Sequence, residues 1–255
     1  MRLKEFSEAI PKPMINIGYR PIIWHLMKYY AHQGHTEFIL CLGYRGDIIK
    51  DYFLNYNECL SNDFVLTDGG RSIQLRNNDI SNWTISFIDT GMHASIGERL
   101  RKVEPLLKND EMFMANYSDG LTDLRLETYI NHFENSNSIA SFLCVPPPMS
   151  FHLVSIGDRD EVKEIIPAGS SGLWMNAGFF LFRRQIFDFV KPGEELINEP
   201  FRRLIEIERL TAFRYTGFFG CMDTFKEKQM FDDAYSRGET PWEVWKHGQP
   251  EEWST

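Results

Sequence analysis

The order of segments along the chain predicts an α/β protein whose sheet is mostly parallel and flanked by helices. Strand-like and helix-like segments alternate through the first 145 residues. The apolar runs FILCLGY and SIASFLCV are short and continuous, which is typical of parallel strands buried on both faces. The helix-like segments carry apolar residues on one face, which is typical of helices that cover a sheet. Together these features predict a Rossmann-like core.

The first half supplies the elements of this core in alternating order. Residues 21–34 have Ile22, Leu26 and Tyr30 on one helical face and Gly34 as a stop signal. The predicted helices are 21–34, 46–56, 96–107 and 124–136, and the predicted strands are 38–44, 84–91, 111–120 and 138–145.

The pattern changes after three consecutive prolines at positions 146–148. Two short strands, 151–157 and 161–166, are expected to pair as an antiparallel hairpin. A strong strand then lies within 176–184, helices within 199–210 and 225–238, and mixed strand and loop between those helices. We therefore expect one domain over residues 1–255, with a core at 1–145 and a β-rich half at 146–255.

Composition excludes several classes of protein. The chain has 255 residues, 43% of them hydrophobic, and its 27 basic and 36 acidic residues give a net charge of −9. A net acidic chain is a poor general binder of nucleic acid. No apolar run approaches the roughly 20 residues that cross a bilayer, so no membrane partner is expected. Four scattered cysteines without CxxC spacing predict reduced, mostly buried thiols in a cytoplasmic protein.

Two aspartates follow predicted strands at positions suited to chemistry. Asp119 lies in NYSDG, and Asp223 lies in CMDT, just before a helix. Ligands of α/β sheets bind beyond the carboxyl ends of strands, and two carboxylates there would suit Mg²⁺. The alternatives are that Asp119 forms an ordinary turn and that Asp223 is a helix N-cap.

The cationic side chains near these segments also have alternative interpretations. Lys12 lies between two prolines, which stiffen the backbone and suit contact with a phosphate, although an exposed lysine in a polyproline-like loop is equally consistent. Arg99 and Arg101 are two apart on a helix, so only one is expected to face a cleft. His25 and His35 fit no zinc pattern and are interpreted as helix-surface or loop residues.

Several of these segments, in the same order, resemble the sugar-1-phosphate nucleotidyltransferases, and most of all the glucose-1-phosphate cytidylyltransferases. The resemblance rests on segments that cover nearly the whole chain: IPKPMINIGYRPIIWHLMKYY, FILCLGYRGDIIKDYF, ISFIDTG, IGERLRKV, NYSDGLTDL, NAGFFLFRR, GCMDTFKEK and PWEVW. It implies a nucleotide-diphospho-sugar transferase fold and an oligomer. It also implies that the β-rich half, residues 146–255, forms the side of the site that binds the sugar.

The resemblance also implies a reaction. A sugar-1-phosphate, glucose-1-phosphate by this branch, attacks the α-phosphorus of a nucleoside triphosphate, CTP by this branch, and pyrophosphate leaves. Asp119 and Asp223 are then Mg²⁺ ligands, and Arg2 and Lys12 are catalytic cations that contact phosphate. The expected substrate-binding residues are Arg99, near the nucleotide, Ser118, and Asn176 and Gly178, near the sugar.

One departure from the family pattern is large. The family opens with a strand and a glycine-rich loop of the form GGxGTR, which binds the triphosphate, whereas the first glycine here is Gly18. Arg2 aligns with the arginine that ends that loop. Loss of the strand would leave unpaired backbone groups in the middle of the sheet. Smaller departures are Ser118 and Glu98, which replace glycines, and Ala177 in the Asn-Gly-Gly run.

These features leave three hypotheses. The chain is an enzyme of the family, or a gene product whose true start lies upstream, or it catalyses the same reaction with another base or sugar. Alternatively, it is a weak or inactive homologue that acts as a binding or regulatory partner. An unrelated α/β hydrolase or kinase is disfavoured, because no nucleophile elbow or P-loop is present.

Overall fold

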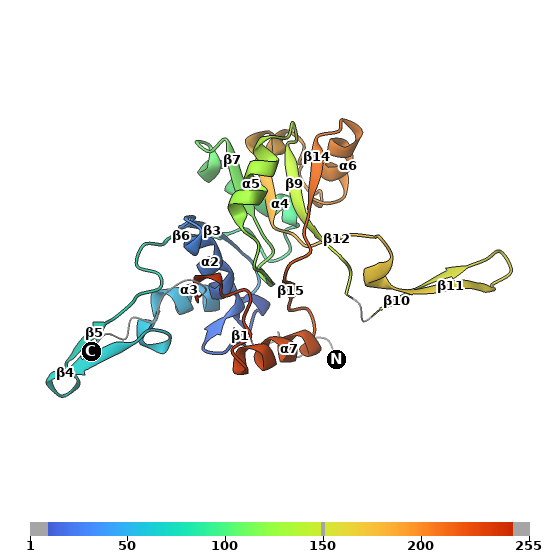
Figure 1. Ribbon diagram of the computed structural model, residues 1–255. Helices are drawn as coiled ribbons and strands as arrows, with labels where there is room; N and C mark the ends of the chain where they lie inside the picture. The colour runs from blue at the N-terminus through green and yellow to red at the C-terminus, as the bar shows by residue number, and fades with distance from the viewer. Residues whose placement is uncertain (1–9, 149–150, 247–255) are drawn as a thin grey trace.

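The computed structural model describes residues 10–148 and 151–246, and its centre is a mixed sheet (Figure 1). The strands are β1 (Asn16–Ile17), β2 (Arg20–Pro21), β3 (Glu37–Leu42), β4 (Phe64–Thr67), β5 (Ser72–Leu75), β6 (Thr84–Asp89), β7 (Met112–Ala115), β8 (Gly120–Thr122), β9 (Ala140–Val145), β10 (His152–Ile156), β11 (Val162–Pro167), β12 (Met175–Asn176), β13 (Phe180–Arg183), β14 (Leu210–Arg214) and β15 (Phe219–Cys221). The α-helices are α2 (Ile22–His32), α3 (Gly46–Leu54), α4 (Ile96–Val103), α5 (Leu126–Glu134), α6 (Glu199–Glu206) and α7 (Phe225–Ser236).

Five strands form the largest sheet. Its order is β12-β9-β13-β7, and β14 pairs with β9 in parallel. β13 runs antiparallel to both β7 and β9, so these two strands share one direction. β3 and β6 form a separate parallel pair. The connection from β6 to β7 contains α4, the kind of crossover that joins parallel strands. The α/β fold class predicted from sequence is confirmed, and strands from both halves of the chain meet in this sheet.

Alternating side chains of β13 explain why helices cover both faces. Leu181 belongs to one buried cluster, together with residues of α2 and α5. Phe180 and Phe182 belong to a second cluster, together with residues of α4 and α6. Because side chains of a strand alternate between faces, each face of β13 needs its own covering helices.

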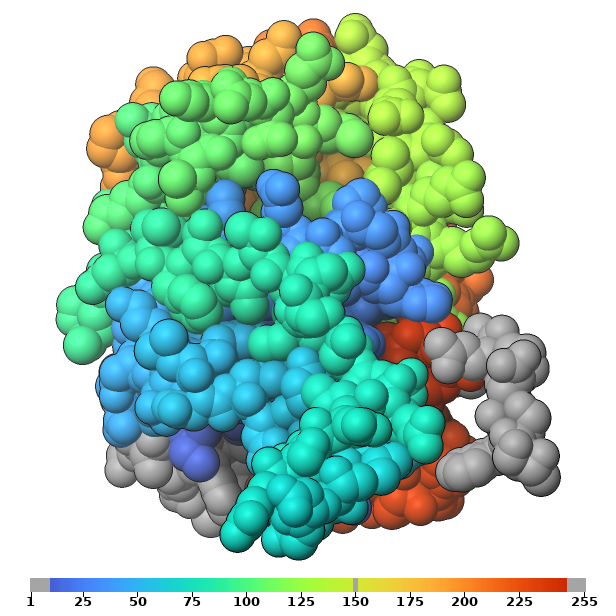
Figure 2. Space-filling model, turned by 90° about the vertical axis from the view of Figure 1, so that its left-hand side faces the viewer, coloured from blue at the N-terminus to red at the C-terminus, as the bar shows by residue number. Residues whose placement is uncertain are grey.

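Two antiparallel hairpins extend from the body of the molecule (Figure 1). One is β4–β5, and the other is β10–β11, the hairpin expected at residues 151–166. Both carry exposed apolar side chains, including Leu66 and Ile73 on the first and Val154 and Ile165 on the second. Figure 2 shows one face of the molecule, formed mostly by the first half of the chain (blue to green).

Two expectations about individual side chains are wrong. His25 is not on the helix surface but is 1% exposed, because α2 is covered on that side by Trp242 and Trp245. The cysteines are all free, as expected, but they are not mostly buried: Cys144 is buried, whereas Cys41 is exposed. Among the described residues, no helix is long and apolar enough to cross a membrane.

Candidate active site

The pairing of β8 with β15 brings Asp119 and Asp223 to the same place. In this short antiparallel sheet Cys221 lies opposite Gly120, so the residues that flank them meet. The backbone N–H of Met222 also donates to the carbonyl of Asp119 at 2.9 Å. Two aspartates that are far apart in the sequence thus come together because two strand ends are hydrogen-bonded to each other.

The ammonium group of Lys12 lies between the two carboxylates. It donates to Oδ2 of Asp119 and to Oδ1 of Asp223. Lys12 begins the 3-10 helix η1 (Lys12–Met14), where Pro13 is an early helical residue and the N–H of Met14 donates to the carbonyl of Pro11. The prolines therefore fix the backbone that presents this ammonium group, as the sequence predicted.

The three charges stabilise one another. Partial burial lowers the pKa of Lys12, but hydrogen bonds to the two aspartates and their negative charges outweigh it, so its pKa is raised above the ordinary value. The hydrogen bond from Lys12 lowers the pKa of Asp223. Both shifts hold Lys12 and Asp223 in their charged forms.

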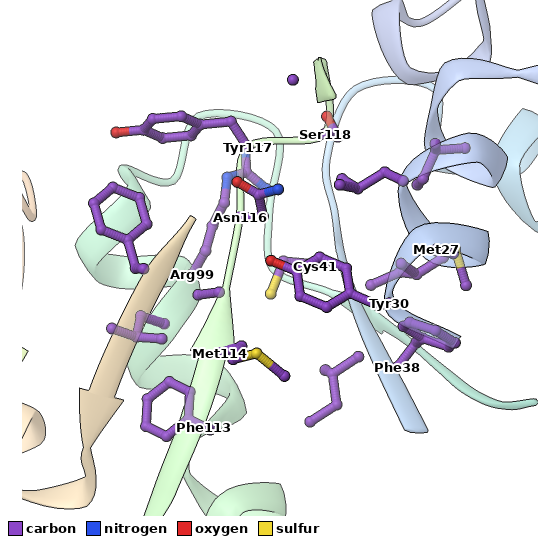
Figure 3. Close-up of a pocket in the computed structure, with 18 of the residues that line it drawn as sticks. Met27, Tyr30, Phe38, Cys41, Arg99, Phe113, Met114, Asn116, Tyr117 and Ser118 are labelled. Carbon is purple, nitrogen blue, oxygen red and sulfur yellow. The ribbon is translucent and has the colours of Figure 1, made fainter. Parts of the chain in front are cut away.

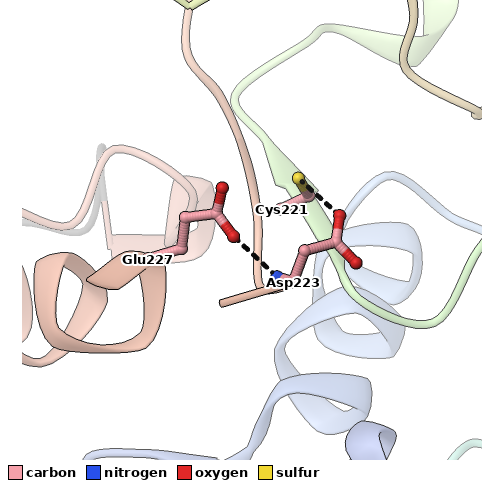
Figure 4. A group of neighbouring side chains, drawn as sticks. All are labelled: Cys221, Asp223 and Glu227. Carbon is pink, nitrogen blue, oxygen red and sulfur yellow. Dashed lines mark hydrogen bonds between the residues drawn. The ribbon is translucent and has the colours of Figure 1, made fainter. Parts of the chain in front are cut away.

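Asp223 is not an N-cap, so that alternative is wrong. The N-cap of α7 is Thr224, whose side chain accepts from the N–H of Glu227. The carboxylate of Glu227 in turn accepts from the N–H groups of Asp223 and Thr224, each at 2.8 Å (Figure 4). This capping box holds the backbone next to Asp223 and leaves its side chain free to face the site. Asp119 does lie in a turn, but it also contacts Lys12.

The donor set fits a hard divalent cation. Oxygen ligands suit such an ion, and the position between the Asp119 and Asp223 carboxylates already holds a positive group, the Lys12 ammonium. Ligand atoms of Cys221, Asp223 and Glu227 also lie within 4.8 Å of one another. However, burial and the nearby carboxylates raise the pKa of Cys221 to about 12, so it remains a thiol, and it contacts Asp223 at 3.4 Å. Sequence reasoning missed both Cys221 and Glu227, although Thr224 followed by Glu227 is a capping-box pattern.

The acidic pair lies at the rim of a large cavity of 1320 Å³. Ser118 and Asn176 line the same cavity, and so does Arg99 (Figure 3). The Arg99 guanidinium is already engaged: its Nη1 donates to Thr90 Oγ1 at 2.6 Å and to the carbonyl of Leu42 at 3.2 Å. It therefore joins the ends of β3 and β6 at the rim. Arg101 points elsewhere and donates to the carbonyl of Val190.

Asn176 and Gly178 shape the loop between β12 and β13. Asn176 Oδ1 accepts from the N–H of Gly178 at 2.9 Å. Gly178 has φ +75°, and a Cβ there would lie 2.9 Å from the ring of Tyr117, so only glycine fits. Asn116, which sequence reasoning missed, accepts from the N–H of Phe179 at 2.9 Å, and its buried Nδ2 has no hydrogen-bond partner. Its position directly after β7 is the sequence feature that could have identified it. Arg2 lies outside the described residues.

The fold defines the class of protein first. The chain is similar to a UDP-glucose pyrophosphorylase in complex with UDP-glucose, with a TM-score of 0.65 and 15% identity over 91% of this chain and 93% of that one. It is also similar to HddC from Yersinia pseudotuberculosis, with a TM-score of 0.63 and 20% identity over 92% and 94%. This is the fold of the sugar-phosphate nucleotidyltransferases.

The sequence comparison then gives the family. The chain is 32% identical to the glucose-1-phosphate cytidylyltransferase of Salmonella typhimurium over 248 residues, which cover 96% of this chain and 95% of that protein. It is 31% identical to a probable glucose-1-phosphate cytidylyltransferase of Bacillus subtilis, over the same shares of both chains. The chain belongs to the glucose-1-phosphate cytidylyltransferase family of nucleotidyltransferases. No protein-family model matches it.

Proposed function

We propose that this protein transfers a cytidylyl group from CTP to glucose-1-phosphate and releases pyrophosphate. The observation that carries the proposal is the convergence of Asp119 and Asp223 on Lys12 at the rim of the cavity, in a member of this family. A phosphate oxygen of glucose-1-phosphate forms a bond to the α-phosphorus, and the bond from that phosphorus to the bridging oxygen of pyrophosphate breaks. No proton transfer is needed, because the attacking phosphate oxygen is already anionic and pyrophosphate leaves as a stable anion.

The protein's task is then to bring two anions together and to offset their charge. Lys12 supplies a fixed ammonium group for the phosphates, and we assign Arg2 the same role. Arg99 fixes the rim where the nucleotide binds, Ser118 faces the cavity beside Asp119, and Asn176 and Gly178 shape the sugar side. Asp119 and Asp223 would hold a divalent cation such as Mg²⁺, which when bound offsets negative charge on phosphate oxygens.

The partners and setting follow from the same reasoning. We propose CTP and glucose-1-phosphate as substrates, a cytoplasmic location and assembly into a homo-oligomer. The exposed apolar residues on the β4–β5 and β10–β11 hairpins support an oligomer, since single exposed apolar residues are ordinary but clusters mark contact surfaces.

The test is a coupled assay of pyrophosphate release with CTP, glucose-1-phosphate and MgCl₂. Asp223→Asn should lower kcat/KM by on the order of 10²–10³-fold, because it removes one of the two carboxylates at the rim. Asp232→Asn is the matched control: it removes an aspartate from the Lys228–Asp232 pair on α7, away from the cavity, and should leave the rate unchanged. Full activity of Asp223→Asn would overturn the metal assignment.

The assay also decides between the enzyme and the inactive homologue. Turnover by the wild-type chain that stops on addition of a chelator supports the enzyme. Absence of turnover together with absence of CTP binding, even with metal present, supports the binding or regulatory protein.

A further inference from the structure

The loop between β12 and β13, residues 177–179, has an unusual backbone. Two successive residues have positive φ, +75° at Gly178 and +49° at Phe179. Glycine adopts this conformation freely, whereas a bulky residue such as Phe179, which is 1% exposed, is strained there. A strained backbone persists only where the surrounding structure holds it. The contacts of Phe179 therefore determine the shape of this loop.

Backbone contacts with β9 hold the first part of the 177–179 loop. The N–H of Ala177 donates to the carbonyl of Leu143 at 2.9 Å, and the N–H of Leu143 donates to the carbonyl of Gly178 at 2.9 Å. The N–H of Gly178 donates to Oδ1 of Asn176. None of these bonds uses the N–H of Phe179, so this group needs an acceptor from another part of the chain.

Asn116 supplies that acceptor from the neighbouring strand. β13 pairs with β7 in a ladder that ends with Phe180 opposite Ala115. The next two residues are joined by a side chain, because Oδ1 of Asn116 accepts from the N–H of Phe179 at 2.9 Å. The side chain thus extends the contact between the two strands by one residue. It links the 177–179 loop to the segment that leads from β7 to Asp119.

The side-chain amide of Asn116 serves this contact only as an acceptor. Its oxygen faces the N–H of Phe179, and its buried Nδ2 has no hydrogen-bond partner among the described residues. The reverse orientation of the amide would place two donors against each other. Because an unpaired buried donor destabilises a fold, the contribution of Asn116 to the structure lies in its oxygen.

The loop also has little room to move toward β7. A Cβ added to Gly178 would lie 2.9 Å from the ring of Tyr117 and 3.1 Å from Oδ1 of Asn116. The Tyr117 ring is itself packed edge-on against Phe180, with 5.3 Å between ring centroids. Figure 3 shows Asn116, Tyr117 and Ser118 in succession at the cavity, which all three line. The loop is therefore held from one side by β9 and from the other by Asn116 and Tyr117.

We propose that Asn116 is a positioning residue for glucose-1-phosphate, because its Oδ1 holds the 177–179 loop in the conformation that binds the sugar. This inference rests on the proposed function, in which Asn176 and Gly178 form the sugar side. Asn116 acts through the backbone of Phe179 rather than by contact with the substrate. Since it lies three residues before Asp119, the sugar side and the proposed metal ligand are attached to the same strand end.

Three variants separate this role from a general effect on the fold. Asn116→Leu has a side chain of similar size but no acceptor, and Asn116→Asp keeps an oxygen in the place of Oδ1. Asn135→Leu is the matched control. Asn135 is an exposed asparagine at the end of α5 whose Nδ2 donates to the carbonyl of Asn131, and it does not line the cavity.

Amide hydrogen exchange reports on the contact without any need for activity. In Asn116→Leu, exchange of the Phe179 N–H should be roughly tenfold faster or more, while exchange of the Leu181 N–H, inside β13, is unchanged. In Asn116→Asp and in Asn135→Leu, the Phe179 N–H should exchange as slowly as in the wild type. Slow exchange of this group in Asn116→Leu would overturn the proposal.

Steady-state kinetics distinguish positioning from a general structural role. Asn116→Leu should raise KM for glucose-1-phosphate by roughly tenfold. It should leave KM for CTP and the Mg²⁺ concentration at half-maximal activity within about twofold, because Lys12 keeps its contacts with Asp119 and Asp223. An unchanged KM for glucose-1-phosphate, or equal changes in all three constants, would overturn the positioning role. Asn135→Leu should have wild-type constants.

A measurement on the wild type covers the case in which Asn116→Leu does not fold. In the presence of a CTP analogue that cannot release pyrophosphate, adding glucose-1-phosphate should slow exchange of the Gly178 and Phe179 amides. Unchanged exchange would overturn the proposal. If the wild type shows this protection but has no turnover with CTP, the proposed function fails and the positioning role stands. Turnover without this protection would support the function and contradict the role.

Discussion

The sheet has a closed side and an open side, although the residues on both are of the same kind. Three of the four residues of β13 are buried, and five of the six residues of β9 are buried. All four residues of the adjacent β7 are only half-buried, and β3 has a single buried residue, Leu42. The difference shows that burial here depends on whether a strand has neighbours on both sides, rather than on its own hydrophobicity.

The open side also coincides with the rim that carries the proposed site. The carboxyl ends of β3 and β7 are where Arg99 fixes the rim and where Asp119 follows β7. A substitution on the open side can therefore act on stability and on the proposed site together.

The largest expected effect comes from truncating one side chain on the closed side of the sheet and one on its open side. Leu181 of β13 lies directly opposite Met114 of β7 in the antiparallel register, and Leu181 is fully buried. Leu181→Ala should lower the free energy of unfolding by about 2–5 kcal/mol, and Met114→Ala by about 1 kcal/mol, because water already reaches Met114. Urea unfolding followed by circular dichroism measures both. Equal losses of stability would mean that Met114 is as tightly packed in solution as Leu181.

The second effect concerns a buried histidine on α2. Burial lowers the pKa of His25 from 6.5 to about 4. The hydrogen bond between its Nε2 and the carbonyl of Ile17 and the charge of Glu243, at 3.8 Å, both oppose this shift, whereas the charge of Lys246 adds to it. The unfolded chain binds the proton more tightly, so His25 stabilises the fold above pH 6.5, and this contribution is lost as the pH falls toward 4. The loss should be roughly 3 kcal/mol.

Unfolding measured at several pH values between 7 and 4 tests this assignment. In His25→Gln the pH dependence over this window should be weaker than in the wild type, whatever the variant's stability at pH 7. An unchanged slope would assign the pH dependence to other groups. Met114→Ala provides a control, since it should retain the wild-type slope.

The third effect distinguishes backbone strain from a steric clash in the loop before β13. Gly178 and Gly193 have nearly the same φ, +75° and +79°, but only Gly178 has neighbours within 4 Å of an added Cβ. Gly193→Ala should lower the free energy of unfolding by about 1 kcal/mol, from backbone strain alone. Gly178→Ala should lower it by about 2–3 kcal/mol, because the added Cβ also clashes with Tyr117. Because Gly178 is on the proposed sugar side, its variant should also raise KM for glucose-1-phosphate more than KM for CTP. Equal costs would show that Tyr117 moves aside freely.

Local sequence patterns were sufficient for most of the fold. The helix at 21–34 was predicted because its apolar residues recur at helical spacing, and the hairpin at 151–166 because two short strands flank a turn. The meeting of Asp119 and Asp223 at the end of strands was also anticipated. These features depend on nearby residues or on the general geometry of α/β sheets.

Other features depend on contacts that no local pattern contains. His25 was interpreted as a helix-surface or loop residue because it fits no zinc pattern, and its burial follows from Trp242, more than 200 positions away. The role of Asn116 arises from its contact with Phe179, in the loop between β12 and β13. The engagement of Arg99 with Leu42 and Thr90 likewise depends on how three elements end at one rim.

The smallest effect tests whether α4, which contacts β3 on the open side of the sheet, is as stably formed as α7. α4 and α7 both begin with a capping box, Ser95 with Glu98 and Thr224 with Glu227. Thr224→Ala should cost about 1 kcal/mol, and Ser95→Ala about 1–2 kcal/mol, because Ser95 Oγ also donates to the carbonyl of Glu194.

The comparison is informative because a cap contributes only while its helix is formed. If α4 is stably formed on the open side of the sheet, Ser95→Ala lowers the free energy of unfolding by its full amount in urea, and amides of α4 exchange roughly tenfold faster. If Ser95→Ala leaves the free energy of unfolding unchanged while Thr224→Ala lowers it by the full expected amount, α4 is not held in place by the open side of the sheet.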